Sequence, residues 1–153
     1  MFFIIAALII VSDQWVKHLI SSNFSLYESR EVIKGIFNLT YLTNTGAAFG
    51  FMAGAGRWHH LFFQLVGFIA LGGLFYLYAS SAGGERLLLW GCSLVFGGAA
   101  GNLVDRIRFQ KVVDFLDFHL GPHHWPAFNI ADSAITVGGF LLAVFFLKNS
   151  GQN

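Results

Sequence analysis

The sequence predicts an all-α polytopic membrane protein with four transmembrane helices and one small antiparallel β element. Hydrophobic residues make up 56% of the 153 residues and charged residues only 11%, whereas a soluble domain carries about 25% charged residues. Four segments are long and apolar enough to cross a bilayer. We therefore expect a single membrane-embedded domain over residues 1–153, with helices at about 2–20, 61–79, 87–105 and 129–147.

The first apolar segment begins at the N-terminus and reads MFFIIAALIIVSDQWVK. A cleaved secretory signal would carry positive charge before its apolar core and a small-x-small cleavage site after it. The first basic residue is Lys17, and no clear cleavage site is visible. We therefore interpret residues 2–20 as a retained transmembrane helix.

The first long link contains SLYESREVIKGIFNLTYLTN, in which β-branched and aromatic residues alternate roughly. This pattern predicts a small antiparallel β element at about 24–58 that lies on the membrane surface. The stretch NTGAAFGF at 44–51 is rich in small residues, which lets a peptide or lipid approach the backbone. It lacks the lysine of a phosphate loop, and a plain turn is the alternative interpretation.

The remaining links determine which segments share a face of the membrane. The short link at 80–86 suits a tight antiparallel turn. The link at 106–128 contains both prolines, Pro122 and Pro126, so we expect a loop there that packs against the membrane. Because spans alternate in direction, both long links lie on one face. That face holds most of the basic residues, which would place it in the cytoplasm, but residues that belong to a site can distort this count.

Ionisable residues within apolar segments are costly unless they are paired or hydrated. Asp13 and Lys17 are four residues apart on the first helix, in the favourable order for an ion pair. They predict a structural pin between helices, with direct catalysis as the alternative. Cys92 is the single cysteine and cannot form an intrachain disulfide.

The third helix ends in GGAAGNLVDR. Gly97 and Gly101 have the spacing that lets another helix backbone approach closely. Asn102, Asp105 and Arg106 follow on one face of the helix. The arginine can pair with Asp105 or reach a substrate carbonyl.

Three more carboxylates lie within or just after the second long link. Asp114 lies in VVDF, where the neighbouring valines favour packing against the membrane, while Asp117 can equally be solvated. Asn129 and Asp132 share one face at the start of the fourth helix, where the helix macrodipole stabilises a carboxylate.

Carboxylates from two elements in a partly dry site indicate acid–base chemistry. Two like charges close together do not both ionise easily, so one carboxyl group keeps its proton. The ionised group can take a proton from water, while the protonated group donates a hydrogen bond to a carbonyl oxygen. Such a pair can hydrolyse an amide without a metal ion or a covalent intermediate.

Two other functions fit parts of the sequence. His119, His123 and His124 with Asp117 could bind zinc, but no HExxH motif is present. A proton or cation transporter would need polar residues through the depth of several spans. Here the polar residues collect at one face, and the second helix has little besides Gln64. No basic cluster predicts binding to nucleic acid.

Five motifs, in this order, resemble the lipoprotein signal peptidase family (signal peptidase II), aspartic peptidases of the bacterial inner membrane. They are DQWVK from Asp13, NTGAAFG from Asn44, GNLVDR from Gly101, VVDF from Val112 and FNIADSAI from Phe128. Together they extend over nearly the whole chain, and none departs from the family pattern.

The resemblance implies an aspartic endopeptidase whose catalytic pair is Asp114 and Asp132. It implies that five residues bind the substrate backbone or support the carboxylates: Asn44, Gly46, Asn102, Arg106 and Asn129. Three further polar residues would be mainly structural: Asp13, Lys17 and Asp105.

The resemblance also implies a substrate and an orientation. The substrate would be a prolipoprotein, cut immediately before its diacylglyceryl-modified cysteine. We expect no metal or other cofactor, no nucleic acid partner, and a monomer surrounded by membrane lipid. Both termini would be cytoplasmic, with both long links, the β element and the active site at the periplasmic face, opposite to the charge count.

Overall fold

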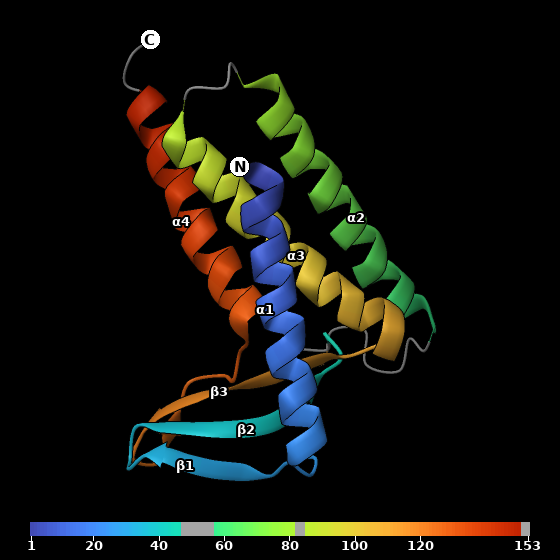
Figure 1. Ribbon diagram of the computed structural model, residues 1–153, viewed down its shortest axis with the longest axis vertical. Coiled ribbons are helices and arrows are strands. Elements are labelled where there is room, and N and C mark those ends of the chain that lie inside the picture. Colours follow the sequence, from blue (N-terminus) through green and yellow to red (C-terminus); the bar gives the residue numbers. More distant parts are fainter. Residues whose placement is uncertain (47–56, 82–84, 151–153) are drawn as a thin grey trace.

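The protein is represented by a computed structural model that describes residues 1–46, 57–81 and 85–150. The helices are α1 (Phe2–Asn23), α2 (Arg57–Ser80), α3 (Arg86–Phe109) and α4 (Ile130–Ser150), and the strands are β1 (Ser29–Ile33), β2 (Phe37–Asn44), β3 (Val112–Leu120) and β4 (His123–His124). In these parts of the chain, four helices are long and apolar enough to cross a membrane. The strands form one antiparallel sheet, in the order β1–β2–β3–β4, at one end of the helices (Figure 1). The predicted fold class is confirmed.

Helix α3 packs against each of the other three helices. A Cβ atom added at Gly97 would lie 3.0 Å from the carbonyl oxygen of Ala6 in α1, and one at Gly98 would overlap the carbonyl oxygen of Ala131 in α4. A Cβ at Gly101 would lie 3.0 Å from a carboxylate oxygen of Asp13. The close approach predicted from the glycine spacing is thereby confirmed, and it lets α1 and α4 contact α3 through backbone.

Helix α3 ends in a turn that leads directly into the sheet. Gln110 adopts a left-handed conformation (φ 58°), and its N–H donates to the carbonyl oxygen of Arg106 at 3.1 Å. Two residues later β3 begins, and the N–H of Val113 donates to Asp105 Oδ2 at 3.2 Å. The start of β3 is therefore attached to the end of α3.

The prediction of a loop at 106–128 is wrong, because this link supplies two strands. β3 pairs with β2, so that Leu42 lies opposite Asp114 and Asn44 opposite Val112. The first residues of β3 are buried almost without interruption. Alternation of polar and apolar residues is the signal by which a sequence reveals a strand, and a strand covered on both faces does not show it.

Apolar packing holds β3 against the helices on both sides of Asp114. Val113 and Phe115 form a buried cluster with Ile20 of α1. A second cluster, around Phe2, lies at the start of α1. The flanking residues of Asp114 are thus fixed in the core, and its backbone position follows from theirs.

Candidate active site

Asp114 lies on β3, and its side chain is only 5% exposed. Asn129 Nδ2 donates to Asp114 Oδ1 at 2.8 Å. Burial raises the pKa of Asp114 from 3.8 to about 6, and the negative charge of Asp132 acts in the same direction. Hydrogen bonding from Asn129 and Asn44 and the positive charge of Lys17 oppose this rise. Asp114 therefore binds a proton much more readily than an ordinary aspartate.

Asp132 lies in the first turn of α4, three residues after the residue that caps this helix. The capping residue is Asn129, whose Oδ1 accepts from the N–H of Asp132 at 2.8 Å. The positive end of the helix macrodipole favours a carboxylate at this position. Asn102 Nδ2 donates to Asp132 Oδ1 at 2.7 Å, so Asp132 is held by α3 as well as by its own helix.

The side-chain amides of Asn129 and Asn102 connect the two carboxyl groups. Asn129 Nδ2, which donates to Asp114, also lies 3.3 Å from Asn102 Oδ1. Asn102 in turn donates to Asp132. A continuous chain of hydrogen bonds, buried at Asp114 and partly buried at Asp132, thus joins β3 to α4, and both predicted aspartates belong to one network.

Lys17 lies beneath this network, buried between α1 and α3. Its Nζ is 2.8 Å from Asp13 Oδ2, 2.9 Å from Asp105 Oδ2 and 3.0 Å from Asn102 Oδ1. The predicted pairing of Asp13 with Lys17 is confirmed, and the cluster joins the two helices. Gln14 Nε2 also donates to Asp105 Oδ1, at 2.7 Å. Sequence reasoning did not single out Gln14, and its place within DQWVK is the only signal that marks it.

Arg106 faces the network from the end of α3. Its guanidinium carbon lies 5.6 Å from the ring centroid of Phe63, and its charge interacts with Asp132, Asp105 and Asp114. Asp105 binds Lys17 instead. The ion pair between Asp105 and Arg106 that the sequence suggested therefore does not form. The buried Nε atom of Arg106 has no hydrogen-bond partner among the described residues. A buried donor without an acceptor costs free energy. The Nε atom is therefore available to donate to a bound group.

Asn44 and Gly46 lie where β2 ends, beside the start of β3. The N–H of Gly46 donates to Asn44 Oδ1 at 2.7 Å. Gly46 has a φ of 85°, and a Cβ atom there would lie 2.9 Å from a ring carbon of Phe63. Only glycine fits both the backbone conformation and the space. The rest of the predicted small-residue stretch, 47–51, is outside the described residues.

A groove of about 280 Å³ opens from the carboxylate of Asp132 along α4. Its lining is mostly apolar and includes Trp125, Phe128, Asp132, Ser133, Thr136 and Val137. Val137 and Trp125 are strongly exposed. The network is therefore continuous with an apolar surface on a transmembrane helix.

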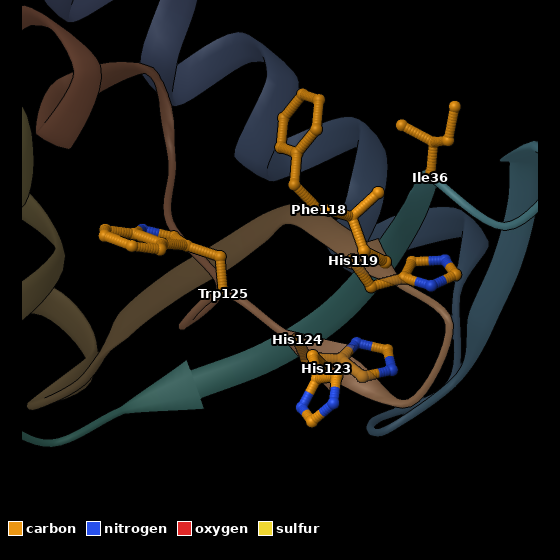
Figure 2. A pocket seen from close by; sticks show the side chains of 7 residues that line it. Ile36, Phe118, His119, His123, His124 and Trp125 are labelled. Atoms are coloured by element: carbon orange, nitrogen blue, oxygen red, sulfur yellow. The ribbon is translucent and has the colours of Figure 1, made fainter.

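The histidines gather at a different place, the hairpin between β3 and β4 (Figure 2). They line an open cavity of about 440 Å³ with Ile36 and Trp125, and the rings of His119 and His124 stack at 4.7 Å. Within the described chain, no group of three His, Cys, Asp or Glu side chains is arranged to hold a metal ion. The zinc alternative thus finds no ligand set in these residues.

Asp117 belongs to this hairpin and not to the buried network. Its Oδ1 lies 2.8 Å from His124 Nδ1, and its Oδ2 accepts from Asn38 Nδ2 at 3.0 Å. Burial raises the pKa of Asp117, but the hydrogen bonds and the charges of the nearby histidines outweigh burial and lower it. Two aspartates three residues apart on one strand therefore have opposite pKa shifts.

Known proteins resemble this chain along nearly its whole length. The family model described as Signal peptidase (SPase) II matches residues 5–148. A lipoprotein signal peptidase of Syntrophus aciditrophicus (strain SB) is 48% identical over 153 residues, covering 99% of this chain and 95% of the relative. That of Desulforapulum autotrophicum is 47% identical over 148 residues, covering 95% and 91%.

Solved structures show the same fold. Two chains, each described as a bacterial membrane enzyme, superpose with TM-scores of 0.87 and 0.86 at 34% and 35% identity. The matches cover 99% and 96% of this chain and 90% and 92% of those chains. Sequence and fold agree, and the chain therefore belongs to the signal peptidase II family of membrane proteases.

Proposed function

We propose that this protease is an aspartic endopeptidase that cleaves prolipoproteins immediately before a diacylglyceryl-modified cysteine. Asp114 and Asp132 are the catalytic pair. The observation that carries the proposal is the hydrogen-bonded chain from Asp114 through two asparagines to Asp132. The names of the relatives support a prolipoprotein substrate.

The environments of the two carboxyl groups assign their roles. Asp114, whose pKa is raised to about 6, binds a proton more readily than an ordinary aspartate, and in its protonated form it donates a hydrogen bond to the scissile carbonyl oxygen. Asp132, held in the first turn of α4, removes a proton from the attacking water. The water oxygen bonds to the carbonyl carbon, and the proton of Asp114 passes to the former carbonyl oxygen. Collapse of this tetrahedral intermediate breaks the C–N bond, the amine takes the proton held by Asp132, and Asp114 recovers its own.

Polar groups around the pair hold the substrate backbone in this mechanism. The Nε atom of Arg106, buried and without a partner in the described residues, is suited to donate to a peptide carbonyl. Asn44 lies beside Asp114 at the end of β2. Asn102 and Asn129 act on the carboxyl groups themselves, because their amide N–H groups already donate to them.

The position of the site at the end of the spans fits a substrate whose lipid stays in the bilayer. Asp132 lies in the first turn of α4, and the apolar groove next to it continues along the same helix. The cysteine lipid can then remain in hydrocarbon while the peptide bond reaches water. We place this end at the periplasmic face of the inner membrane, with both termini cytoplasmic, because the family assignment outweighs a count of nine basic residues.

Cleavage of a lipid-modified prolipoprotein in detergent tests the proposal. Asp114→Asn and Asp132→Asn are expected to abolish cleavage while the protein remains folded. Asp117→Asn, which changes an aspartate on the same strand, is the matched control and is expected to cleave. Full activity in either dyad variant refutes the mechanism. Loss of wild-type activity with a chelator, restored by zinc, would favour a metal enzyme.

Reporter fusions test the orientation separately. A reporter active only in the periplasm is fused within the first long link, at the turn between β1 and β2, and in the short link after Ser80. We expect activity from the first fusion alone. Activity from the short link alone would reverse the proposed orientation.

A further inference from the structure

We infer that Lys17 is a positioning residue for the dyad: its ammonium group fixes the Asn102 side-chain amide so that the NH2 group faces Asp132. This role presupposes the Asp114–Asp132 pair proposed above. Sequence spacing alone suggests only a pin between two helices for Lys17. The contacts of its Nζ atom extend that role to the reacting groups.

The hydrogen bonds of Lys17 are fully used within the protein. Its side chain is 4% exposed, and an ammonium group has three donors. The three partners are Asp13 Oδ2 at 2.8 Å, Asp105 Oδ2 at 2.9 Å and Asn102 Oδ1 at 3.0 Å. Lys17 has no donor left for a substrate, so it acts on the reaction through its partners.

The contact with Asn102 determines how that amide is oriented. Lys17 can only donate, so the amide must present its oxygen to Nζ. The nitrogen then lies on the other side, where it donates to Asp132 Oδ1 at 2.7 Å. A flipped amide would place its oxygen against a carboxylate and its NH2 against an ammonium group, and both contacts would be repulsive.

The second asparagine is oriented independently of Lys17. Asn129 presents its oxygen to the backbone N–H of Asp132, at 2.8 Å, which leaves its NH2 group for Asp114. Asn129 is thus anchored at a helix N-terminus, whereas Asn102 Oδ1 accepts from Lys17 at 3.0 Å and from Asn129 at 3.3 Å. Loss of Lys17 removes the shorter, charged contact to Asn102 and weakens the hold on that amide, while Asn129 keeps its own anchor.

The charge of Lys17 also reaches the dyad. It lies between Asp13 and Asp105, and its positive charge favours the ionised form of Asp114, lowering the pKa of that carboxyl against the effect of burial. The groups that act on Asp114 are Asp132, Asn129, Lys17, Asn44 and Arg106, and Lys17 and Arg106 are the cations among them. Removal of Lys17 therefore raises the pKa of Asp114 further.

The test compares kcat, KM and the pH profile of Lys17→Met with those of the wild type, per folded molecule. We expect kcat to fall about tenfold or more while KM changes less than about twofold, because an interaction with the reacting groups is lost. We expect the alkaline limit of activity to move to higher pH. A residue that only pins α1 to α3 would reduce the folded fraction but leave kcat and the pH profile unchanged, and that result overturns the inference.

A second variant separates folding from positioning. Lys17→Met leaves Asp13 and Asp105 without a cation, whereas Lys17→Met combined with Asp13→Asn removes one negative charge as well. The double variant is expected to regain stability but not kcat. Recovery of kcat along with stability would reduce Lys17 to a structural role.

The orientation of the Asn102 amide can also be read in protein that keeps Lys17, which covers the case in which neither Lys17 variant folds. The side-chain NH2 signal of Asn102 is identified by its loss in Asn102→Ser, in protein labelled with 15N-asparagine. It is expected to shift in Asp132→Asn, and an unchanged signal overturns the inference. If Asp114→Asn or Asp132→Asn cleaves normally, the proposed mechanism itself fails. If both are inactive while Lys17→Met keeps the wild-type kcat and pH profile, only the role of Lys17 fails.

Discussion

Replacing Asp114 with asparagine is expected to make the protein inactive and, at neutral pH, more stable. The folded protein raises the pKa of this carboxyl from 3.8 to about 6. A carboxyl whose pKa is raised on folding favours the folded state when protonated, so the stability falls as the pH rises from about 4 through 6. Above that range, the folded protein contains a carboxylate that it disfavours.

The size of this penalty follows from the pKa values. The rise is about two pH units, and each unit corresponds to about 1.4 kcal/mol, so the ionised form costs about 3 kcal/mol in the folded state. Asparagine removes the charge and keeps an oxygen that can accept from Asn129 Nδ2, as Asp114 Oδ1 does now. We expect a gain of about 1–3 kcal/mol, with 3 as the upper bound.

Thermal unfolding in detergent micelles at pH 7.5 and at pH 5 measures the effect. The advantage of Asp114→Asn over the wild type is expected at pH 7.5 and should shrink at pH 5, where the wild-type carboxyl is mostly protonated. Asp117→Asn is the matched control from the same strand. The pKa of Asp117 is lowered in the folded protein. Its carboxylate therefore contributes stability that is lost only as the pH falls through the folded pKa. Asp117→Asn should accordingly be less stable than the wild type at pH 7.5.

Two results would refute the reasoning. One is an Asp114→Asn protein that is no more stable than the wild type at pH 7.5. The other is a gain that stays the same at pH 5, because a pH-independent gain cannot arise from the ionisation of Asp114.

Three further variants test other parts of the structure. Gly98→Ala places a methyl group against the backbone of α4 and should lower the free energy of unfolding by about 1–3 kcal/mol. Gly139→Ala, with open space around it, is the control and should not lower it, and thermal unfolding compares the two variants. Arg106→Lys keeps the charge but removes the Nε donor, so kcat/KM should fall about tenfold or more in the cleavage assay, with unchanged thermal stability. Gly46→Ala forces an L-residue to a φ of 85° against Phe63 and should lower the free energy of unfolding by about 1–2 kcal/mol. Gly35→Ala has a similar φ but no neighbour within 4 Å, so it should lose only the part of this free energy that comes from the backbone conformation.

The membrane-spanning helices were predictable because their signal is local. Twenty apolar residues in a row identify a span whatever surrounds it, and all four predicted spans are present. The pairing of Asp13 with Lys17 is equally local, since four residues separate them on one helix. The remaining candidate residues were identified by the resemblance of short motifs to a known family. The structure places four of them in one network: Asp114, Asn129, Asn102 and Asp132.

The features that could not be predicted depend on contacts between distant segments. Strand β3 has no alternation to reveal it, because β2, α1 and the segment before α4 surround its first residues. Gln14 is an ordinary amide until Asp105, 91 residues away, comes within 2.7 Å. The orientation of the Asn102 amide depends on a donor from α1 and an acceptor from α4, and no single segment contains that information.

In the proposed mechanism the catalytic pair is divided between β3 and α4, and this division affects when the protein can become a protease. Asp114 is synthesised before α4, and its carboxyl group acquires Asn129 and Asp132 only when the last helix packs against α3. A chain whose final span is not yet inserted therefore has one aspartate without its partner. Under the proposed mechanism such a chain cannot cut neighbouring membrane proteins during its own biosynthesis. Proteolytic activity would then begin with the last step of assembly, and cleavage would report that all four spans are in place.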